Sequence, residues 1–185
     1  MTEPLTVELG PRDLLVVAGL PGAGKTTMLR EVRELPVLDS DQVRARMRVL
    51  LPAWVPYRLY RPIVHAWHRL RVVGHAAGAT GPVIVHEPST RASTRTLLAL
   101  VAALTGRRIH LLWLDVTAEE ALAGQRARGR LIRPRSFARH VRRAERFRRS
   151  LLAHRVPAGW SSARVTTRGR EWYCRSEPAV SLTSK

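Results

Sequence analysis

The sequence predicts an α/β fold, a three-layer domain built on a mainly parallel, five-stranded sheet. Three observations predict it. Short, continuous apolar runs recur along the chain, as expected of strands that are buried on both faces. Between them lie segments whose apolar residues recur every three or four positions, and this alternation of strand and helix is typical of a parallel sheet. The length of 185 residues fits one domain with a core that needs neither a disulfide nor a structural metal.

The apolar runs predict the strands in order. The first is LLVVA at residues 14–18, which ends at Gly19, and the second is a shorter run at 36–38 that ends in Asp39. The other expected strands are VIVH at 83–86, IHLLWL at 109–114 and a weaker run near 163–167. Because most of these runs are apolar throughout and do not alternate with polar residues, we expect both of their faces to be covered.

Helical spacing of apolar residues connects these strands. It begins at residues 26–35, and Pro36 forbids its continuation. Further helices are expected over 42–51, 62–77, 92–105, 117–128 and 134–151. Pro62 suits the first turn of its helix. Thr117 and Glu120 form a T-x-x-E capping box, which predicts a helix start at this point.

The predicted elements lie between two polar ends. Residues 1–13 contain two prolines, and we expect them to form an extended lead-in. Residues 14–168 are expected to form the folded domain, and residues 169–185 a loose C-terminal tail.

The composition excludes several classes of protein. Cys174 is the only cysteine, which excludes an intramolecular disulfide and any CxxC-type zinc or redox site. No apolar run reaches the roughly 18 residues that a membrane span needs. Glu3 and Glu8 stand where a secretory leader would be basic and apolar. We therefore expect a cytoplasmic protein without membrane contact.

The charge is strongly positive, with 32 basic against 14 acidic side chains and a net charge of +18. It permits an acidic partner such as a nucleotide, a charged metabolite or a nucleic acid. Lysine occurs only at Lys25 and Lys185, and every other basic residue is arginine, as in a protein from a GC-rich genome. This bias explains much of the charge by itself. It also singles out Lys25 as the one lysine within the expected domain.

Residues 19–26, GLPGAGKT, match the pattern G-x-x-x-x-G-K-[ST] between a predicted strand and a predicted helix. In this context the glycines allow backbone N–H groups to point at a phosphate. Lys25 would neutralise the β- and γ-phosphates, and the Thr26 hydroxyl would ligate Mg²⁺. ATP is favoured over GTP because no N-K-x-D motif is present. The residues expected to bind the nucleotide are Gly19, Pro21, Gly22, Ala23, Gly24, Lys25, Thr26 and Thr27.

Two aspartates follow the second predicted strand, Asp39 and Asp41. The carboxyl ends of parallel strands open into the ligand crevice, so Asp41 could take the proton of an acceptor hydroxyl during phosphoryl transfer. Arg44, one helical turn later, could bind the acceptor. The alternative is that an aspartate only caps the following helix, and we favour this role for Asp39.

The loop GLPGAGKTT and the segment VLDSDQVR at 37–44 resemble the kinase group of P-loop proteins. This group contains zeta-type toxins, polynucleotide 5′-hydroxyl kinases and chloramphenicol phosphotransferase. The resemblance covers about residues 14–153 and implies a P-loop NTPase or kinase fold, with an ATP-binding domain over 14–168. It also implies that Asp41 is the catalytic base and that Arg44 contacts the acceptor.

The resemblance implies further roles after the third strand. Glu87 takes the place of an acidic residue near Mg²⁺ or substrate, and Thr90 and Arg91 would face the acceptor. The chain departs from the usual pattern here, because His86-Glu87-Pro88 stands in place of an aspartate followed by a small residue.

Residues 125–130, QRARGR, resemble the arginine-rich lid of these kinases. The resemblance implies that Arg126 stacks on the adenine and that Arg130 or Arg133 offsets phosphate charge in the transition state. The planar, permanently charged guanidinium group suits both roles. Residues 126–149 contain 11 arginines, so most of them are expected to be solvated surface residues.

Together these features predict an ATP-dependent kinase that moves the γ-phosphate of Mg·ATP to a hydroxyl of a small molecule. One alternative is a kinase of 5′-hydroxyl nucleic-acid ends, which the basic charge permits. Against it, the arginine-rich segment 136–149 offers no aromatic residues for base stacking except Phe137 and Phe147, which lie at core-facing spacing. Another alternative is a non-catalytic, nucleotide-dependent switch that binds a protein partner, which one sequence cannot identify.

Overall fold

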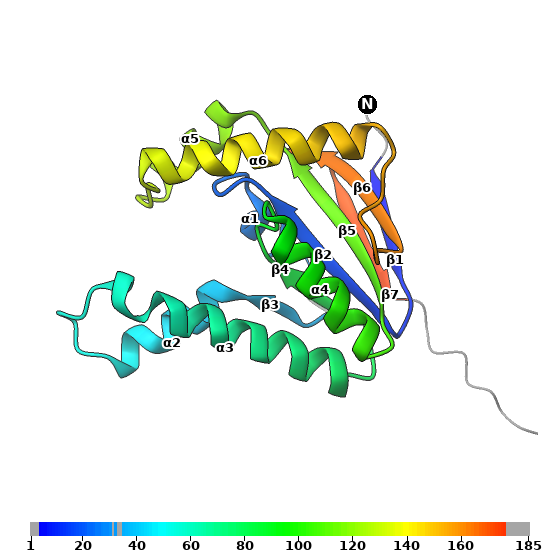
Figure 1. Ribbon diagram of the computed structural model, residues 1–185, viewed down its shortest axis with the longest axis horizontal. Coiled ribbons are helices and arrows are strands. Elements are labelled where there is room, and N and C mark those ends of the chain that lie inside the picture. Colours follow the sequence, from blue (N-terminus) through cyan, green and yellow to red (C-terminus); the bar gives the residue numbers. More distant parts are fainter. Residues whose placement is uncertain (1–3, 31, 33–34, 177–185) are drawn as a thin grey trace, which may run out of the picture.

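The computed structural model describes residues 4–30, 32 and 35–176 and contains a five-stranded, fully parallel central sheet (Figure 1). Its strands, in spatial order, are β3 (Val37–Asp39), β4 (Val83–His86), β2 (Asp13–Gly19), β5 (Arg108–Asp115) and β6 (Ser162–Thr167). The five strands expected from the apolar runs are confirmed. The carboxyl ends of β3, β4 and β2 lie next to one another, which is where a parallel sheet binds its ligands.

Strand β2 shows why the apolar runs are continuous. Its seven residues are all buried, and successive side chains point to opposite faces. Leu14 and Val16 join a core on one face, while Leu15 and Val17 join a second core on the other face. A strand with two buried faces favours apolar residues along its length, so its sequence does not alternate, and its one charged residue, Asp13, is paired with Arg108.

The layer over the first face consists mainly of helices (Figure 1). Helices α4 (Ala92–Leu104) and α6 (Pro134–Leu152) contribute most of its apolar contacts with the sheet. Helix α5 (Ala118–Ala127) adds Ala121, and its capping box is present as expected. On α6, Phe147 packs edge-on against Trp113 of β5, with ring centroids 5.3 Å apart.

The layer over the second face contains the short helix α1 (Lys25–Leu29) and a two-stranded ribbon. The ribbon pairs β1 (Leu5–Leu9) with β7 (Trp172–Ser176) in parallel. Residues 172–176 are therefore a strand and not the loose tail expected from 169 onward. The physical reason is burial, because Trp172 is only 5% exposed and its indole N–H donates to the carbonyl of Met28 at 3.2 Å. The rest of the expected tail, residues 177–185, lies outside the described residues.

Helices α2 (Ser40–Leu50) and α3 (Tyr57–Gly78) form a separate hairpin beside β3 (Figure 1). A small core of its own, including Val43 and Val64, holds the pair together. Helix α3 begins at Tyr57, so the expectation that Pro62 occupies the first turn is wrong. The proline lacks the N–H that would bond to the carbonyl of Arg58, but that residue is exposed to water, which can satisfy the carbonyl instead.

Two further observations bear on the sequence-based expectations. Helix α1 ends at Leu29, earlier than the expected end at residue 35, and residues 31, 33 and 34 lie outside the described part of the chain. Within residues 4–30, 32 and 35–176, no helix is both long enough and apolar enough to cross a membrane.

Candidate functional site

The loop after β2 has the backbone that its glycines allow. Gly22 and Gly24 adopt φ angles of 93° and 107°, which residues other than glycine rarely adopt. Gly22 also lies against α5, where an added Cβ would come within 2.1 Å of the carbonyl oxygen of Ala121. This loop is thus pressed against α5 while it turns back from β2 into α1.

Lys25 lies inside the loop with 4% of its surface exposed. Its Nζ donates to the carbonyl oxygens of Gly19 at 2.9 Å and Leu20 at 2.8 Å. Burial lowers the pKa of Lys25 to about 7, although the negative charges of Asp39 and Glu87 oppose the shift. A phosphate in the loop would offer this ammonium group a charged acceptor in place of two neutral ones.

Asp39 is the N-cap of α2, as the capping hypothesis predicts. Its Oδ1 accepts from the backbone N–H of Asp41 at 2.9 Å, and its Oδ2 lies 2.6 Å from Nδ1 of His86. Burial tends to raise the pKa of Asp39, but the hydrogen bonds from His86 and Asp41 outweigh it and leave the pKa below its usual range. Because Asp39 provides the cap, the carboxylate of Asp41 is available for another role.

Asp41 meets Arg130 across the site. Its Oδ2 accepts from Nη1 of Arg130 at 2.8 Å, and the two side chains are 45% and 52% exposed. An ion pair this exposed contributes little to stability, so either partner can exchange it for a ligand at small cost. Both residues line a cavity of about 250 Å³ together with Lys25, Thr26 and Arg44. Of the residues expected to act on phosphates or acceptor, these five are brought together.

Arg44 points into this cavity from α2. Its guanidinium carbon lies 4.1 Å from the ring centroid of Tyr57, which holds the planar group by a cation–π contact. Its Nε is buried and has no hydrogen-bond partner among the described residues. The side chain is therefore oriented by packing while part of its hydrogen-bonding capacity is unused.

The segment between α5 and α6, residues 128–133, is connected to the phosphate loop by Gln125 and Arg128. Gln125 is buried; its Nε2 donates to the carbonyl of Pro21 and its Oε1 accepts from the N–H of Ile132, both at 3.0 Å. Arg128 donates to the hydroxyl of Thr26 at 3.3 Å and to that of Thr27 at 3.2 Å. Sequence reasoning overlooked both residues, although each stands within the QRARGR segment.

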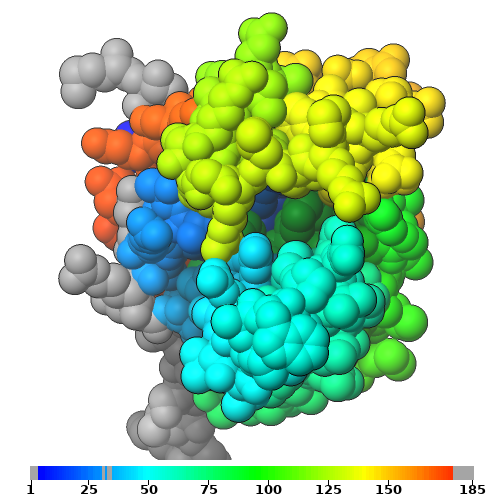
Figure 2. Space-filling model, turned by 90° about the vertical axis from the view of Figure 1, so that its left-hand side faces the viewer, coloured from blue at the N-terminus to red at the C-terminus, as the bar shows by residue number. Residues whose placement is uncertain are grey.

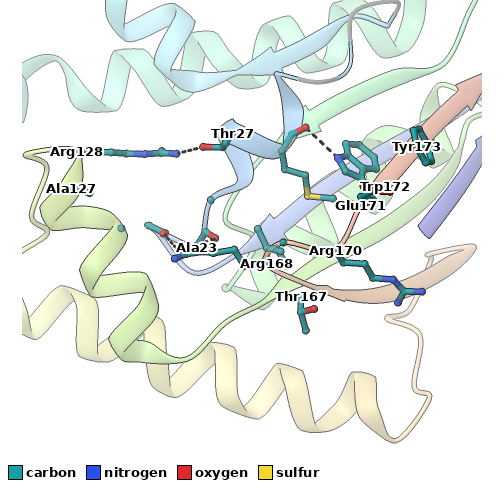
Figure 3. A pocket seen from close by; sticks show the side chains of 16 residues that line it. Ala23, Thr27, Ala127, Arg128, Thr167, Arg168, Arg170, Glu171, Trp172 and Tyr173 are labelled. Atoms are coloured by element: carbon teal, nitrogen blue, oxygen red, sulfur yellow. Dashed lines mark hydrogen bonds between the residues drawn. The ribbon is translucent and has the colours of Figure 1, made fainter. Parts of the chain in front are cut away.

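A second cavity, of about 700 Å³, lies on the other side of the phosphate loop (Figure 3). Arg128 lines both cavities, whereas Arg126 is exposed and lines neither. Arg168 crosses beneath the loop and donates to the carbonyls of Gly22 at 3.0 Å and Ala23 at 3.2 Å. Residues 169–173 complete the wall, and their assignment to a loose tail is why the sequence did not reveal this cavity.

The acidic residue after β4, Glu87, lies close enough to Lys25 of the phosphate loop for their charges to interact. Glu87 does not line the 250 Å³ cavity, and its Oε2 lies 3.6 Å from Nε2 of His68 on α3. Burial raises the pKa of Glu87, against the opposing charges of Arg69 and Lys25. Thr90 shares a 2.9 Å hydrogen bond with Nδ1 of His140. Together with Arg91, Thr90 lines a third cavity, between α4 and α6.

Two walls enclose the site. Helices α2 and α3, in cyan, form the lower wall in Figure 2, and the yellow-green segment between α5 and α6 reaches down toward it. The contact between Asp41 and Arg130 joins these two walls.

Within the part of the chain that the structure describes, no group of three or more His, Cys, Asp or Glu side chains could hold a metal ion. A magnesium ion carried by nucleotide phosphates needs fewer protein ligands, and the Thr26 hydroxyl and Asp39 carboxylate both line the 250 Å³ cavity.

Comparison with solved structures identifies the fold. The chain is similar to the tunicamycin resistance protein of Deinococcus radiodurans, with 17% identity, a TM-score of 0.53, and coverage of 83% of this chain and 86% of that one. It is also similar to a structure from the PezAT toxin–antitoxin system of Streptococcus pneumoniae, with 14% identity, a TM-score of 0.62, and coverage of 86% and 69%. Shikimate kinase from Acinetobacter baumannii gives 20% identity, a TM-score of 0.52, and coverage of 85% and 86%.

The sequence itself matches one family. No curated protein matches it. Residues 14–152, which run from β2 to the end of α6, match the family described as AAA domain. The match includes the phosphate loop, Asp41 and the segment between α5 and α6, and the fold that carries them is shared with the shikimate kinase above. The chain is thus a member of the AAA domain family and has the fold of the P-loop kinase group.

Proposed function

We propose that the protein is a kinase that transfers the γ-phosphate of Mg·ATP to a hydroxyl group of a small molecule. The observation that carries the proposal is the 250 Å³ cavity, which Lys25 of the phosphate loop, Asp41 at the acceptor side and Arg130 line together. A nucleotide-binding loop alone would support a switch as well. A carboxylate and an arginine beside that loop are what phosphoryl transfer requires in addition.

The nucleotide would extend from one cavity to the other. Its phosphates would lie in the loop formed by residues 19–26, and its adenine in the 700 Å³ cavity beyond (Figure 3). Because Arg128 lines both cavities, we assign to it the contact with the nucleotide that the lid resemblance implies for Arg126. Arg168 supports this arrangement, because its hydrogen bonds to the carbonyls of Gly22 and Ala23 hold a positive charge against the loop.

In the proposed reaction, the acceptor hydroxyl displaces Arg130 from Asp41 and donates its proton to the freed carboxylate. The hydroxyl oxygen forms a bond to the γ-phosphorus while the bond from that phosphorus to the ADP oxygen breaks. Lys25 and Arg130 offset the negative charge that moves onto the bridging and terminal oxygens. Magnesium, held through Thr26, would supply further charge neutralisation on the phosphates. Arg44 lines the same cavity and would bind the acceptor through its guanidinium group.

The test follows label from γ-labelled Mg·ATP into a fractionated cell extract with wild type and Asp41→Asn. Asp115→Asn is a matched control, because Asp115 also lies at the carboxyl end of a strand and pairs with an arginine, Arg148, at 2.7 Å but lies outside the 250 Å³ cavity. We expect Asp41→Asn to lose transfer by about 10²- to 10⁴-fold and to keep its ATP affinity. Asp115→Asn should transfer at the wild-type rate.

Three results would change the proposal. Equal transfer by Asp41→Asn would show that another group is the base. Label in the nucleic-acid fraction would make the acceptor a 5′-hydroxyl end. Absence of label from every fraction, with ATP still bound, would indicate a nucleotide-dependent switch.

A further inference from the structure

The third cavity, between α4 and α6, is unused by the proposed reaction. It has a volume of about 830 Å³ and lies over the first face of the sheet. Both helices pack on this same face of the sheet (Figure 1). The cavity is separate from the 250 Å³ cavity: Pro88 lines one and Thr90 the other, and the two sets of lining residues do not overlap.

Its charged lining is entirely basic. Arg91 and Arg95 come from the start of α4, and Arg143 and Arg146 from α6, while no acidic side chain lines the cavity. The side chains of Arg91, Arg143 and Arg146 make no hydrogen bond or ion pair with any described residue. Four guanidinium groups around one cavity repel one another, so the arrangement favours an anion between them.

Arg95 is held in place by the cavity wall. Its guanidinium carbon lies 3.7 Å from the ring centroid of Phe147, and its Nη1 donates to the carbonyl of Ser89 at 2.7 Å. The cation–π contact and the hydrogen bond leave the remaining N–H groups of the fork in a defined orientation. A group oriented before binding loses less conformational entropy when a ligand arrives.

Two further sets of donors are unsatisfied here. Trp160 lies on the cavity wall with 7% of its surface exposed, and its indole N–H is buried without a partner in the described chain. Helix α4 begins at the same wall, and its N-cap residue, Arg91, provides no side-chain cap. The first-turn N–H groups of this 13-residue helix therefore also lack acceptors, and together with the helix dipole they favour a negative charge.

We propose that the cavity between α4 and α6 is a second anion-binding site and that it binds the phosphate group of a small molecule. The fork of an arginine matches the oxygens of a phosphate, and an indole N–H and free backbone N–H groups are donors without acceptor capacity. The site does not depend on the proposed reaction, in which none of its residues takes part; Thr90 and Arg91, which the resemblance places at the acceptor, line this cavity and not the 250 Å³ cavity.

The test uses pyrophosphate as the probe and the indole N–H resonance of Trp160 in a ¹H–¹⁵N spectrum as the reporter, assigned with Trp160→Phe. Backbone resonances of residues 19–26 report separately on any pyrophosphate in the phosphate loop. We expect a saturable shift of the Trp160 resonance. The double variant Arg143→Gln/Arg146→Gln should weaken it by about tenfold or more, since each lost charged hydrogen bond costs about that much.

A matched control removes the same charge from the same helix. Arg142 and Arg149 are exposed on α6 and do not line the cavity, so Arg142→Gln/Arg149→Gln should leave the affinity unchanged. An equal loss in both double variants would overturn the proposal in favour of diffuse attraction by net charge. A shift confined to residues 19–26 would overturn it in favour of the phosphate loop alone.

The source of the phosphate is identified by the same reporter. Tighter binding of ribose 5-phosphate than of inorganic phosphate would support an organic phosphate ester as the ligand. The reverse order would support the inorganic anion.

Discussion

Gly124 offers a test of the contact between α5 and the phosphate loop. It lies within α5, where helix propensity alone predicts that Gly124→Ala would stabilise the protein by about 1 kcal/mol. In the structure, an added Cβ would lie 2.2 Å from the carbonyl oxygen of Gly22. An ordinary van der Waals contact begins at 3.4 Å, so 3.4 − 2.2 leaves 1.2 Å to be gained by moving backbone.

Because the obstructing atom belongs to the main chain, a rotamer change cannot relieve the clash. Overpacking of this kind costs about 1–3 kcal/mol, and a backbone displacement belongs at the upper end of that range. After the helix-propensity gain of about 1 kcal/mol is subtracted, we expect Gly124→Ala to destabilise the protein by about 1–2 kcal/mol. The displaced loop should also bind ATP more weakly.

Gly74 provides the matched control. It lies within α3, is exposed, and has nothing within 4 Å of the position of an added Cβ. Gly74→Ala should therefore stabilise the protein by about 0.5–1 kcal/mol. Urea unfolding measures both variants, and ATP titration measures the loop. If Gly124→Ala were as stable as Gly74→Ala, the close approach of α5 to the phosphate loop would be refuted.

Three other predictions concern the site and the ribbon. Bound phosphates should raise the pKa of Lys25 from about 7, so ATP binding should take up a proton and should weaken as the pH rises from 7.5 to 9. Calorimetry in two buffers of different ionisation enthalpy measures this proton uptake. If no proton were taken up, the burial of Lys25 would be contradicted. Gln125→Leu leaves the carbonyl of Pro21 and the N–H of Ile132 without partners, so the free energy of unfolding should fall by about 1–3 kcal/mol. If unfolding experiments showed no loss, water would replace the side chain. Trp172→Ala should destabilise the protein by about 3–5 kcal/mol, because the side chain is buried. If residues 169–176 were a loose tail, the substitution would not change the stability. We expect no change for Tyr173→Ala, because Tyr173 is half exposed.

Much of the fold could be predicted because the relevant signals are local. The apolar run at 14–18 became a strand with two buried faces, and Thr117 and Glu120 formed their capping box within a single turn. The ribbon of β1 and β7 was missed because its strands are 5 residues each, mix polar with apolar positions, and acquire their buried face only from the sheet beneath. Pairing between residues at opposite ends of the chain leaves no periodic signal in either segment.

The candidate site divides in the same way. Lys25 was identified from sequence because the phosphate loop is one continuous segment whose chemistry depends on spacing within it. The sequence favoured Asp39 as the helix cap and Asp41 as the base, and the structure confirms the cap, because Asp39 accepts the N–H of Asp41. Arg130 contacts Asp41 although the two residues are 89 positions apart in the sequence. Several arginines lie near Arg130 in the sequence, and only the packing of α5 decides which of them faces Asp41.

The sequence alone therefore determined the five strands of the central sheet, most of the helices and the phosphate loop, because these follow from backbone preferences and side-chain spacing over a few residues. Only the tertiary structure decided three other features: the order of the strands, the position of Arg128 instead of Arg126 beside the phosphate loop, and the basic cavity between α4 and α6. In each case the deciding quantity is the distance between groups far apart in the chain, and that distance is set by how helices pack on the sheet.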